Sequence, residues 1–370
     1  MKKMQKVLAL VLVIALAMLA LAACGGSTPS TTAAPTTTKA PETTKAPETQ
    51  APGTTEAPAT EEVRVDPFRF SWGTSGSSTG GYIVAAGIAD TINKAQNIFT
   101  ADVEASQGQS ENVRGIRDGV WHVGQGNNDG TYYYYTSTAA WEGDGGDDIR
   151  DLFPLPSYVH HIVVRAGSGI EKVEDIKGKK VAVGTAGSGY YTWSNTVLTA
   201  LGYTFDDIEA VYIQPTQACE SLQDGQIDAL MFANFMPWGT LTDTVTNTDV
   251  KFIPLGEEYV KKMQEVNPAY APFTIPANTY PKQPEDIVTS SQQAMVWTLG
   301  DALTEDQAYL FVKTVYETYE DWKGVHDSCK FMNWNDPCAE MVVPLHIGAY
   351  KFYKEKGFNI PEAAIPPEAK

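Results

Sequence analysis

Positively charged residues, histidines and cysteines are all scarce in this chain of 370 residues. It has 27 lysines and arginines against 45 aspartates and glutamates, which gives a net charge of −18. Because phosphate binding relies on lysine and arginine, a charge of this sign argues against a nucleic-acid partner. Five histidines, four cysteines and the lack of a His-Glu-x-x-His pattern also argue against a catalytic metal ion. We expect neither a metal nor any other cofactor.

The N-terminus has the composition of a secretory signal. Three lysines within residues 2–6 precede an apolar run over residues 7–23, which is shorter than the roughly 20 residues of a spanning helix. The run ends in Leu21-Ala22-Ala23-Cys24-Gly25, which resembles the bacterial lipobox. We therefore predict a lipoprotein signal peptide over residues 1–23, cleaved before Cys24, whose thiol carries the lipid. An uncleaved membrane anchor is the alternative, and both place the rest of the chain outside the cytoplasm.

The other three cysteines do not have the spacing of a metal site. Cys329 and Cys338 lie nine positions apart in a stretch rich in turn-forming residues, and export from the cytoplasm permits a disulfide between them. Cys219 lies in a helical pattern, where we expect a buried free thiol.

Residues 24–65 are expected to form a tether rather than a folded domain. Residues 25–62 consist almost entirely of Thr, Ala, Pro, Ser, Glu and Lys, and the unit that begins at Thr38 repeats at Thr44. A segment without aromatic residues cannot bury a hydrophobic core, so it stays extended. We infer a spacer between a lipid anchor and a folded body that begins near residue 66.

The body alternates apolar β-branched runs with helical patterns, which predicts an α/β fold with mainly parallel strands. It contains a similar half-unit twice. The predicted strand over residues 68–72 leads into a Gly/Ser/Thr loop and a helix, and the predicted strand over residues 180–183 does the same. In both half-units an Asp-Gly pair ends a second helix further on. Two similar lobes, each with such a loop, predict a ligand cleft between them.

Each of the two loops is a candidate anion site. A Gly/Ser/Thr loop before a helix presents free backbone N–H groups at the positive end of the helix dipole, and small residues let a ligand approach the backbone. An ordinary strand-to-helix turn is the alternative for either loop.

The first loop also matches a catalytic pattern. Gly76-Ser77-Ser78-Thr79-Gly80 fits the nucleophile elbow of serine hydrolases, with Ser78 as the nucleophile and His326 or His346 as the base. No oxyanion-loop motif precedes it, so an exported hydrolase is a minor alternative and we expect no enzyme activity.

In the order of its motifs, the body resembles the TAXI-type solute receptors of TRAP (tripartite ATP-independent periplasmic) transporters, over about residues 66–358. The most specific similarities are Ile275-Pro276-Ala277-Asn278-Thr279-Tyr280-Pro281 and Pro344-Leu345-His346-Ile347-Gly348-Ala349. The resemblance implies a two-lobed type II periplasmic-binding-protein fold, with a mainly parallel sheet flanked by helices in each lobe. Such a protein closes on a small solute, often a carboxylate, and delivers it to a TRAP membrane permease. A receptor for an ABC importer is the alternative, and we expect a monomer.

The resemblance also assigns the lobes and the ligand site. Lobe I comprises residues 66–160 and 288–370, and lobe II comprises residues 161–287. The ligand site is expected at Gly73, Thr74, Ser78, Thr79, Gly80, Gly81, Tyr82, Asn127, Asn128, Asp129, Gly187, Ser188, Gly189, Tyr190, Asn234 and Trp238. The chain departs from the family pattern at Gly81-Tyr82-Ile83 and at Gly108-Gln109-Ser110, where the family commonly has Tyr-Tyr-Pro and Gly-Gly-Ser. The family's usual ligands are therefore not assumed for lobe I.

Neither loop contains its own cation, because no lysine or arginine occurs within residues 73–89 or 185–214. Backbone dipoles and hydroxyl groups are therefore expected to hold a carboxylate, with Arg114 or Arg165 nearby. The apolar part of the ligand would be covered by aromatic side chains, namely Tyr82, Tyr190, Tyr191 and Trp238.

Overall fold

The computed structural model describes residues 65–77, 79–186 and 188–370, which belong to one compact unit, Glu61–Lys370. The predicted signal peptide, the predicted lipidation site Cys24 and the predicted tether up to residue 64 lie outside the described residues, and so do Ser78 and Gly187. None of the helices in the described ranges combines the length and the apolar character that crossing a membrane requires.

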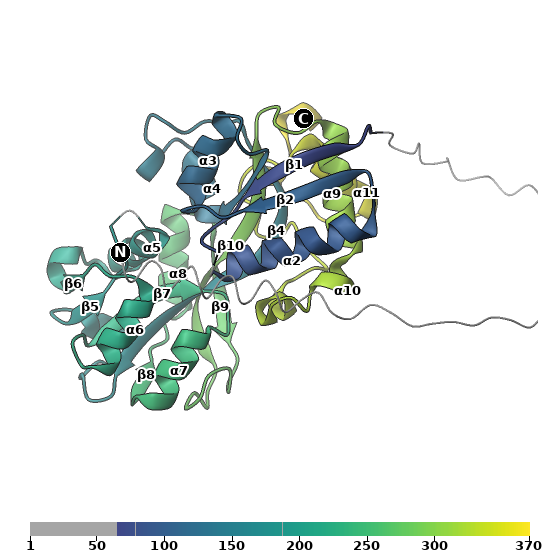
Figure 1. The fold of residues 1–370 in the computed structure, drawn as a ribbon. Helices are drawn as coiled ribbons and strands as arrows, with labels where there is room; N and C mark the ends of the chain where they lie inside the picture. Colours follow the sequence, from purple (N-terminus) through teal and green to yellow (C-terminus); the bar gives the residue numbers. More distant parts are fainter. Residues whose placement is uncertain (1–64, 78, 187) are drawn as a thin grey trace, which may run out of the picture. The chain divides into compact units, whose positions relative to one another are not determined.

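The described residues form one sheet of 10 strands, surrounded by helices (Figure 1). The strands are β1 (Phe68–Gly73), β2 (Phe99–Glu104), β3 (Val123–Asn127), β4 (Ile149–Arg165), β5 (Lys180–Ala182), β6 (Glu209–Val211), β7 (Ala229–Asn234), β8 (Val250–Phe252), β9 (Tyr270–Ile275) and β10 (Ile287–Leu299). The α-helices are α2 (Gly80–Ala95), α3 (Gln109–Arg117), α4 (Asn128–Tyr135), α5 (Gly189–Leu201), α6 (Pro215–Gln223), α7 (Gly239–Asn247), α8 (Glu257–Val266), α9 (Glu305–Glu317), α10 (Tyr319–Trp322) and α11 (Ile347–Lys356). The strand order is β2-β1-β3-β10-β4-β7-β5-β6, while β8 pairs with β4 and β9 pairs with β10.

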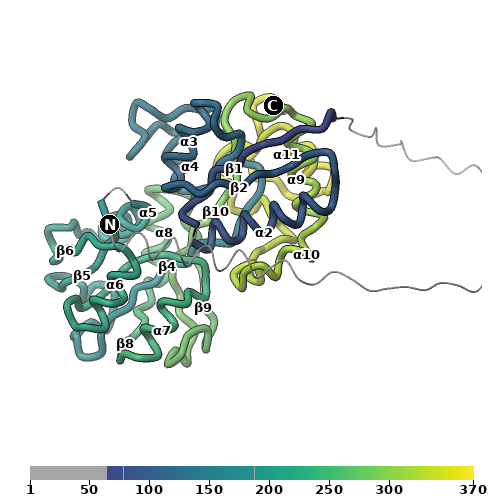
Figure 2. The backbone as a smooth tube through the Cα atoms, in the orientation of Figure 1, coloured from purple at the N-terminus to yellow at the C-terminus, as the bar shows by residue number. Residues whose placement is uncertain are grey.

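Two long strands, β4 and β10, join the two parts of this sheet (Figure 2). β4 has 17 residues and β10 has 13. β10 pairs with β9 near its start and with β3 near its end, whereas β4 pairs with β10 first and then with β7 and β8. We call β1–β3 with their helices the first part of the sheet and β5–β7 with theirs the second part.

The sheet is less parallel than the sequence predicted. β1 pairs in parallel with β2 and β3, and β5 pairs in parallel with β6 and β7. Strand–helix–strand connections of this kind produce parallel pairs. However, β10 is antiparallel to β3 and to β4, and β4 is antiparallel to β7. The physical reason is that one crossing strand leads from the first part to the second while the other leads back.

Alternate residues of the second part pack into different hydrophobic clusters. Ile162 and Val164 of β4 lie in a cluster with Trp193 of α5, whereas Val163 lies in a cluster with Leu222 of α6. Because successive side chains of a strand point to opposite faces, helices bury both faces of this part. The first part has one larger cluster, in which aromatic rings of β1, β4 and α9 meet edge to face: Trp72, Phe153 and Phe311.

The expected disulfide is not formed, because Cys329 and Cys338 are both free and buried. The Cys329 carbonyl accepts a hydrogen bond from the Tyr319 hydroxyl at 3.0 Å, whereas Cys338 lies near the carboxyl of Asp151. Both side chains fill the hydrophobic core of the first part, and burial raises the pKa of the two thiols to about 11 and about 12. Cys219 is a buried free thiol in α6, as predicted.

We expect Gly348→Ala to destabilise the fold. A Cβ atom built on Gly348, near the start of α11, meets the Glu305 carbonyl and lies 2.7 Å from Tyr309 N. Both are backbone atoms of α9, so relief requires a helix to shift, and we expect a loss of about 1–3 kcal/mol in the free energy of unfolding. Urea denaturation measures this loss. The matched control is Gly239→Ala at the start of α7, where a Cβ has no neighbour within 4 Å; an equal loss there would contradict the explanation.

Candidate functional site

One helix in each part of the sheet begins in the same way. Thr79 precedes α2 and Ser188 precedes α5, and both have extended backbone dihedrals, with φ of −87° and −81°. The Thr79 hydroxyl accepts a hydrogen bond from Tyr82 N at 3.3 Å, and the Ser188 hydroxyl accepts one from Tyr191 N at 3.2 Å. A cap of this kind satisfies one of the free N–H groups of a helix start. The remaining N–H groups, with the helix dipole, make each start suitable for an anion.

Three polar side chains converge on the start of α2. A Cβ atom built on Gly81 would lie 2.8 Å from Gln125 Nε2, 2.9 Å from Ser75 Oγ and 3.3 Å from the Tyr158 hydroxyl oxygen. Ser75 Oγ also lies 2.6 Å from Thr79 Oγ1. Gln125 is buried, and its Oε1 atom has no hydrogen-bond partner among the described residues. A glycine at position 81 is therefore needed for this approach.

Residues from the two parts of the sheet meet around these groups. Phe235, which follows β7, lies 2.8 Å from a Cβ built on Gly80, and its ring centroid is 4.5 Å from that of Tyr158. A Cβ built on Gly189, the first residue of α5, would lie 3.9 Å from Asn127 Nδ2 at the end of β3. Burial raises the pKa of Tyr158, which belongs to the crossing strand β4. The start of α2 thus lies beside a residue from the second part of the sheet, and the start of α5 lies beside a residue from the first.

Some of the expected site residues support the loop from behind. Thr74 is fully buried, and its hydroxyl donates to the Glu104 carbonyl at 2.8 Å. A Cβ built on Gly73 would collide with the Trp121 ring and lie 2.8 Å from Asn112 Oδ1. Both residues therefore pack β1 against its neighbours. Protein atoms enclose the Thr74 side chain and the space beside Gly73.

Asn128 and Asp129 at the start of α4 are also buried. The Asn128 amide donates to the Glu340 carbonyl at 3.1 Å, while its Oδ1 has no partner among the described residues. The Asp129 carboxylate accepts hydrogen bonds from Gln292 and Tyr270 side chains and from Gly130 N. Its oxygens are therefore held by donors of the protein itself.

The expected site residues Asn234 and Trp238, at the end of β7 and after it, differ in their contacts. Asn234 is partly exposed, and its Oδ1 accepts from Phe235 N at 2.8 Å. Trp238 packs on Phe232 with ring centroids 4.7 Å apart, and Trp238 N donates to the Tyr280 hydroxyl. Trp238 and Tyr190 both border the hydrophobic cluster that contains Phe232. Phe235, which lies between these two expected residues, is the residue of this connection that reaches α2.

The two arginines expected near the ligand do not lie beside these helix starts. Arg165 ends β4, and its guanidinium carbon would lie 2.9 Å from a Cβ on Gly225, just after α6. Arg114 is exposed on α3. Attraction for an anion at the loops therefore depends on backbone N–H groups and hydroxyls.

The two histidines considered as catalytic bases both cap short helical segments. His326 Nδ1 accepts a hydrogen bond from Ser328 N at 3.1 Å, and His346 Nδ1 accepts one from Gly348 N at 3.2 Å. These bonds fix each imidazole to its own segment.

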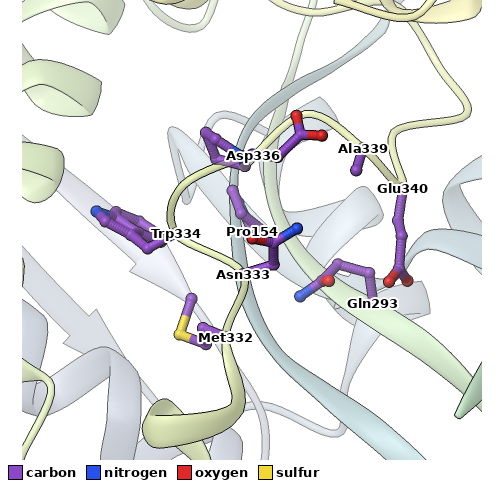
Figure 3. Close-up of a pocket in the computed structure, with 9 residues that line it drawn as sticks. Pro154, Gln293, Met332, Asn333, Trp334, Asp336, Ala339 and Glu340 are labelled. Atoms are coloured by element: carbon purple, nitrogen blue, oxygen red, sulfur yellow. The ribbon is translucent and has the colours of Figure 1, made fainter. Parts of the chain in front are cut away.

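A small cavity lies next to the start of α4 (Figure 3). It has a volume of about 20 Å³ and is lined by Pro154 of β4, Gln293 of β10 and the segment from Met332 to Glu340, which is room for about one water molecule. The Glu340 carbonyl, which accepts from Asn128, connects the cavity to α4. Burial raises the pKa of the Glu340 carboxyl. The sequence analysis did not predict this cavity.

The strand order with two crossing strands, and a capped helix start in each part of the sheet, define the class of protein. It is an α/β protein with the type II periplasmic-binding-protein fold, which confirms the predicted fold class. The chain belongs to the NMT1-like family, whose sequence pattern matches residues 72–357.

Solved structures similar to this chain include several binding proteins. The aliphatic sulphonate binding protein SsuA from Escherichia coli has 14% identity and a TM-score of 0.46, with 78% of this chain and 84% of that chain covered. The alkanesulfonate-binding protein SsuA from Xanthomonas axonopodis pv. citri, bound to MOPS, has 14% identity and a TM-score of 0.45, covering 83% and 99%. A structure from work on glutathione import through GshT and the cystine ABC importer TcyBC of Streptococcus mutans has 13% identity and a TM-score of 0.44, covering 72% and 95%.

Proposed function

We propose that the chain is a receptor that captures a small organic solute and catalyses no reaction. The observation that carries this proposal is that two capped helix starts each lie beside a residue of the other part of the sheet: Gly80 of α2 beside Phe235, and Gly189 of α5 beside Asn127. Each start contributes free N–H groups from a different part of the sheet. Membership of the NMT1-like family is consistent with a solute-binding role.

We further propose that the solute carries a carboxylate. The polar groups around α2 and α5 are hydroxyls, amides and backbone N–H groups, and the nearest aromatic side chains are Tyr158, Tyr190 and Phe235. Such a site attracts an anion through dipoles rather than through a full positive charge. The aromatic rings provide an apolar surface for the rest of the molecule.

The membrane partner is a separate proposal. We propose the membrane component of an ABC importer, the kind of transporter named for the Streptococcus mutans structure described above. The TRAP permease that the sequence resemblance implied is the second candidate, because family membership does not distinguish the two. The test is co-purification of the tagged, membrane-attached protein from its own cells: recovery of an ATPase subunit supports the ABC importer, and recovery of a large permease without an ATPase supports TRAP.

We expect the protein to be attached to the outer face of the membrane through lipid on Cys24. Cells grown with a labelled fatty acid should incorporate the label into the wild-type protein and not into Cys24→Ser. Equal labelling of both proteins would contradict lipidation at this residue.

A bulky side chain at the start of α5 should abolish solute binding without unfolding the protein. Ser188 is partly exposed, so tryptophan fits there but covers the N–H groups of the helix start. Native mass spectrometry of the purified protein identifies any co-purified solute, and thermal shifts over a panel of carboxylates, sulfonates, amines and sugars extend the search. We expect Ser188→Trp to lose the bound mass and the shift, with a binding loss of at least 100-fold, about 2.7 kcal/mol.

The matched control for this test is Thr199→Trp, an exposed position in the last turn of the same helix. It should bind as the wild type does. Binding that survives in Ser188→Trp would contradict the proposed site, and a panel in which only cations or sugars bind would contradict a carboxylate solute. Ester hydrolysis that is lost in Ser78→Ala would instead support the hydrolase.

A further inference from the structure

A buried chain of four hydrogen bonds connects α5 to α4. Trp193 Nε1 lies 3.2 Å from Ser290 Oγ, which lies 2.8 Å from His160 Nδ1. His160 Nε2 lies 2.8 Å from Gln292 Oε1, and Gln292 Nε2 lies 2.7 Å from Asp129 Oδ1. The chain therefore starts on α5, passes through both crossing strands and ends on α4, behind the two loops of the candidate site.

The residues at the two ends of this series of hydrogen bonds fix which group donates and which accepts in every bond. The indole Nε1 of Trp193 only donates, and a carboxylate such as that of Asp129 only accepts. Gln292 must present its NH₂ to Asp129, so its carbonyl faces His160, whose Nε2 then carries the proton. Nδ1 of that neutral imidazole accepts from the Ser290 hydroxyl, which in turn accepts from Trp193. Every donor points toward Asp129.

All five side chains of the chain are buried, with exposures from 0% to 4%. The His160 ring is stacked on Trp193, with centroids 4.3 Å apart and an angle of 4° between the planes. Two more hydrogen bonds hold the Asp129 carboxylate, from Gly130 N at 2.8 Å and from the Tyr270 hydroxyl at 3.3 Å. In a buried network, the loss of one link leaves polar groups unpaired, which makes the whole set sensitive to a single change.

We propose that Asp129 is a positioning residue whose carboxylate, through Gln292 and His160, holds the start of α5 against the start of α4, and that protonation of this carboxylate loosens the arrangement. Asp129 acts behind the site and does not touch the solute. The consequence for solute capture rests on the proposed function, whereas the coupling between the two helices does not.

Asp129 changes charge in mildly acidic solution, whereas the groups that face it do not. Burial raises the pKa of Asp129 to about 6. Tyr133 on its own helix and Tyr270 on β9 both have pKa values raised by burial, so they stay neutral. Burial lowers the pKa of His160 on β4 to about 3. The neighbours on β10 and just after α8, Gln292 and Asn267, carry no charge.

The test uses the whole chain labelled with ¹⁵N-histidine, and three substitutions. In wild type, long-range ¹H–¹⁵N spectra should show His160 protonated on Nε2, with a chemical-shift inflection near pH 6 that reports Asp129. Asp129→Asn should remove this inflection. Gln292→Met should remove it too, because it interrupts the chain. The control is Gln293→Met, on the next position of β10, which hydrogen-bonds to Leu155 O and Ser157 Oγ instead and should keep the inflection.

Hydrogen exchange at the α5 amides from Thr192 onward, which donate to backbone carbonyls, provides the second readout, expressed as protection factors to remove the intrinsic pH effect. Protection should fall about tenfold between pH 7.5 and pH 5 in wild type, the order expected for losing a hydrogen bond to a charged group. Asp129→Asn and Gln292→Met should already show the lower value at pH 7.5.

Three results would overturn the proposal. They are a proton on Nδ1 of His160, an inflection near pH 6 that persists in Asp129→Asn, and unchanged hydrogen-exchange protection of the α5 amides in both Asp129→Asn and Gln292→Met. No solute enters these measurements, so a failed solute screen would count against the proposed function alone.

Discussion

Replacing Asp151 by asparagine should stabilise the protein increasingly as the pH rises above about 4. Asp151 lies on β4 with no exposed surface, and neither of its carboxylate oxygens has a hydrogen-bond partner among the described residues. Burial raises the pKa of this carboxyl well above its ordinary value of 3.8. In the unfolded chain the group loses its proton near pH 4, whereas the folded protein must keep it or bury an unpaired charge.

The sign and size of this effect follow from proton linkage. Above pH 4 the folded state binds one more proton at Asp151 than the unfolded state, so wild-type stability falls with rising pH by about 1.4 kcal/mol per unit from this group. Asparagine has the same shape and does not titrate. The difference in unfolding free energy between Asp151→Asn and wild type should therefore grow by that amount per unit, until the folded carboxyl itself ionises.

Urea denaturation of both proteins at several values between pH 4.5 and pH 8 measures this difference. Asp147→Asn is the matched control, four residues earlier and exposed, and its difference from wild type should stay nearly constant. If the difference in unfolding free energy between Asp151→Asn and wild type were equally independent of pH, hydrogen-bond partners or water would have to stabilise the charged carboxylate in the folded protein.

The helix starts of the site could be predicted from the sequence because local chemistry decides them. A Gly/Ser/Thr loop between a predicted strand and a predicted helix contains the residue types that favour an N-cap, and the structure has N-caps at Thr79 and Ser188. The crossing of β4 and β10 was harder to predict. Their pairing joins segments more than 100 residues apart, and an apolar run does not reveal which strand will lie beside it.

Long-range contacts also explain which site residues were missed. Gln125 and Tyr158 reach the start of α2 from β3 and β4, and nothing in their local sequence signals a meeting at Gly81. Asp129 shows the converse. Its residue type and position fit a ligand contact, but Tyr270 and Gln292 enclose it from more than 140 positions away.

One sequence departure has a direct structural counterpart. Gln109 stands where the resembled family commonly has glycine, and its side chain lies over two glycines of the neighbouring elements. A Cβ built on Gly126 would lie 2.6 Å from Gln109 Cδ, and one on Gly130 would lie 2.7 Å from it. The longer side chain is accommodated because both facing positions lack a Cβ, so the start of α3 packs closely against β3 and α4.

Replacing His161 by phenylalanine should make the protein less sensitive to acid. His161 is buried on β4, stacked on Phe232 with centroids 5.4 Å apart, and its Nε2 lies 3.0 Å from the Tyr280 hydroxyl oxygen. Trp238 N donates to the same hydroxyl oxygen, and the neutral imidazole shares one hydrogen bond with that hydroxyl through Nε2. Burial lowers the pKa of His161 from 6.5 to about 3.

A folded-state pKa below the unfolded value means that only the unfolded chain takes up the proton between about pH 6.5 and pH 3. The stability that neutral His161 contributes is complete above pH 6.5 and is lost on acidification, by up to about 4–5 kcal/mol for a difference of this size. His160 contributes in the same direction, so the comparison with His161→Phe isolates one of the two losses. We expect the unfolding free energy of His161→Phe to fall less steeply between pH 6.5 and pH 4 than that of wild type.

The loss of the hydrogen bond to Tyr280 must be separated from the loss of titration. Tyr280→Phe removes the same hydrogen bond but keeps the imidazole, so it should lower stability at pH 7 by about 1 kcal/mol and retain the wild-type acid slope. His161→Phe should carry a similar constant cost with a reduced slope. Equal slopes in all three proteins would mean that the folded state admits the charged imidazole, because a buried ring without a charged partner cannot otherwise accept the proton as readily as the unfolded chain.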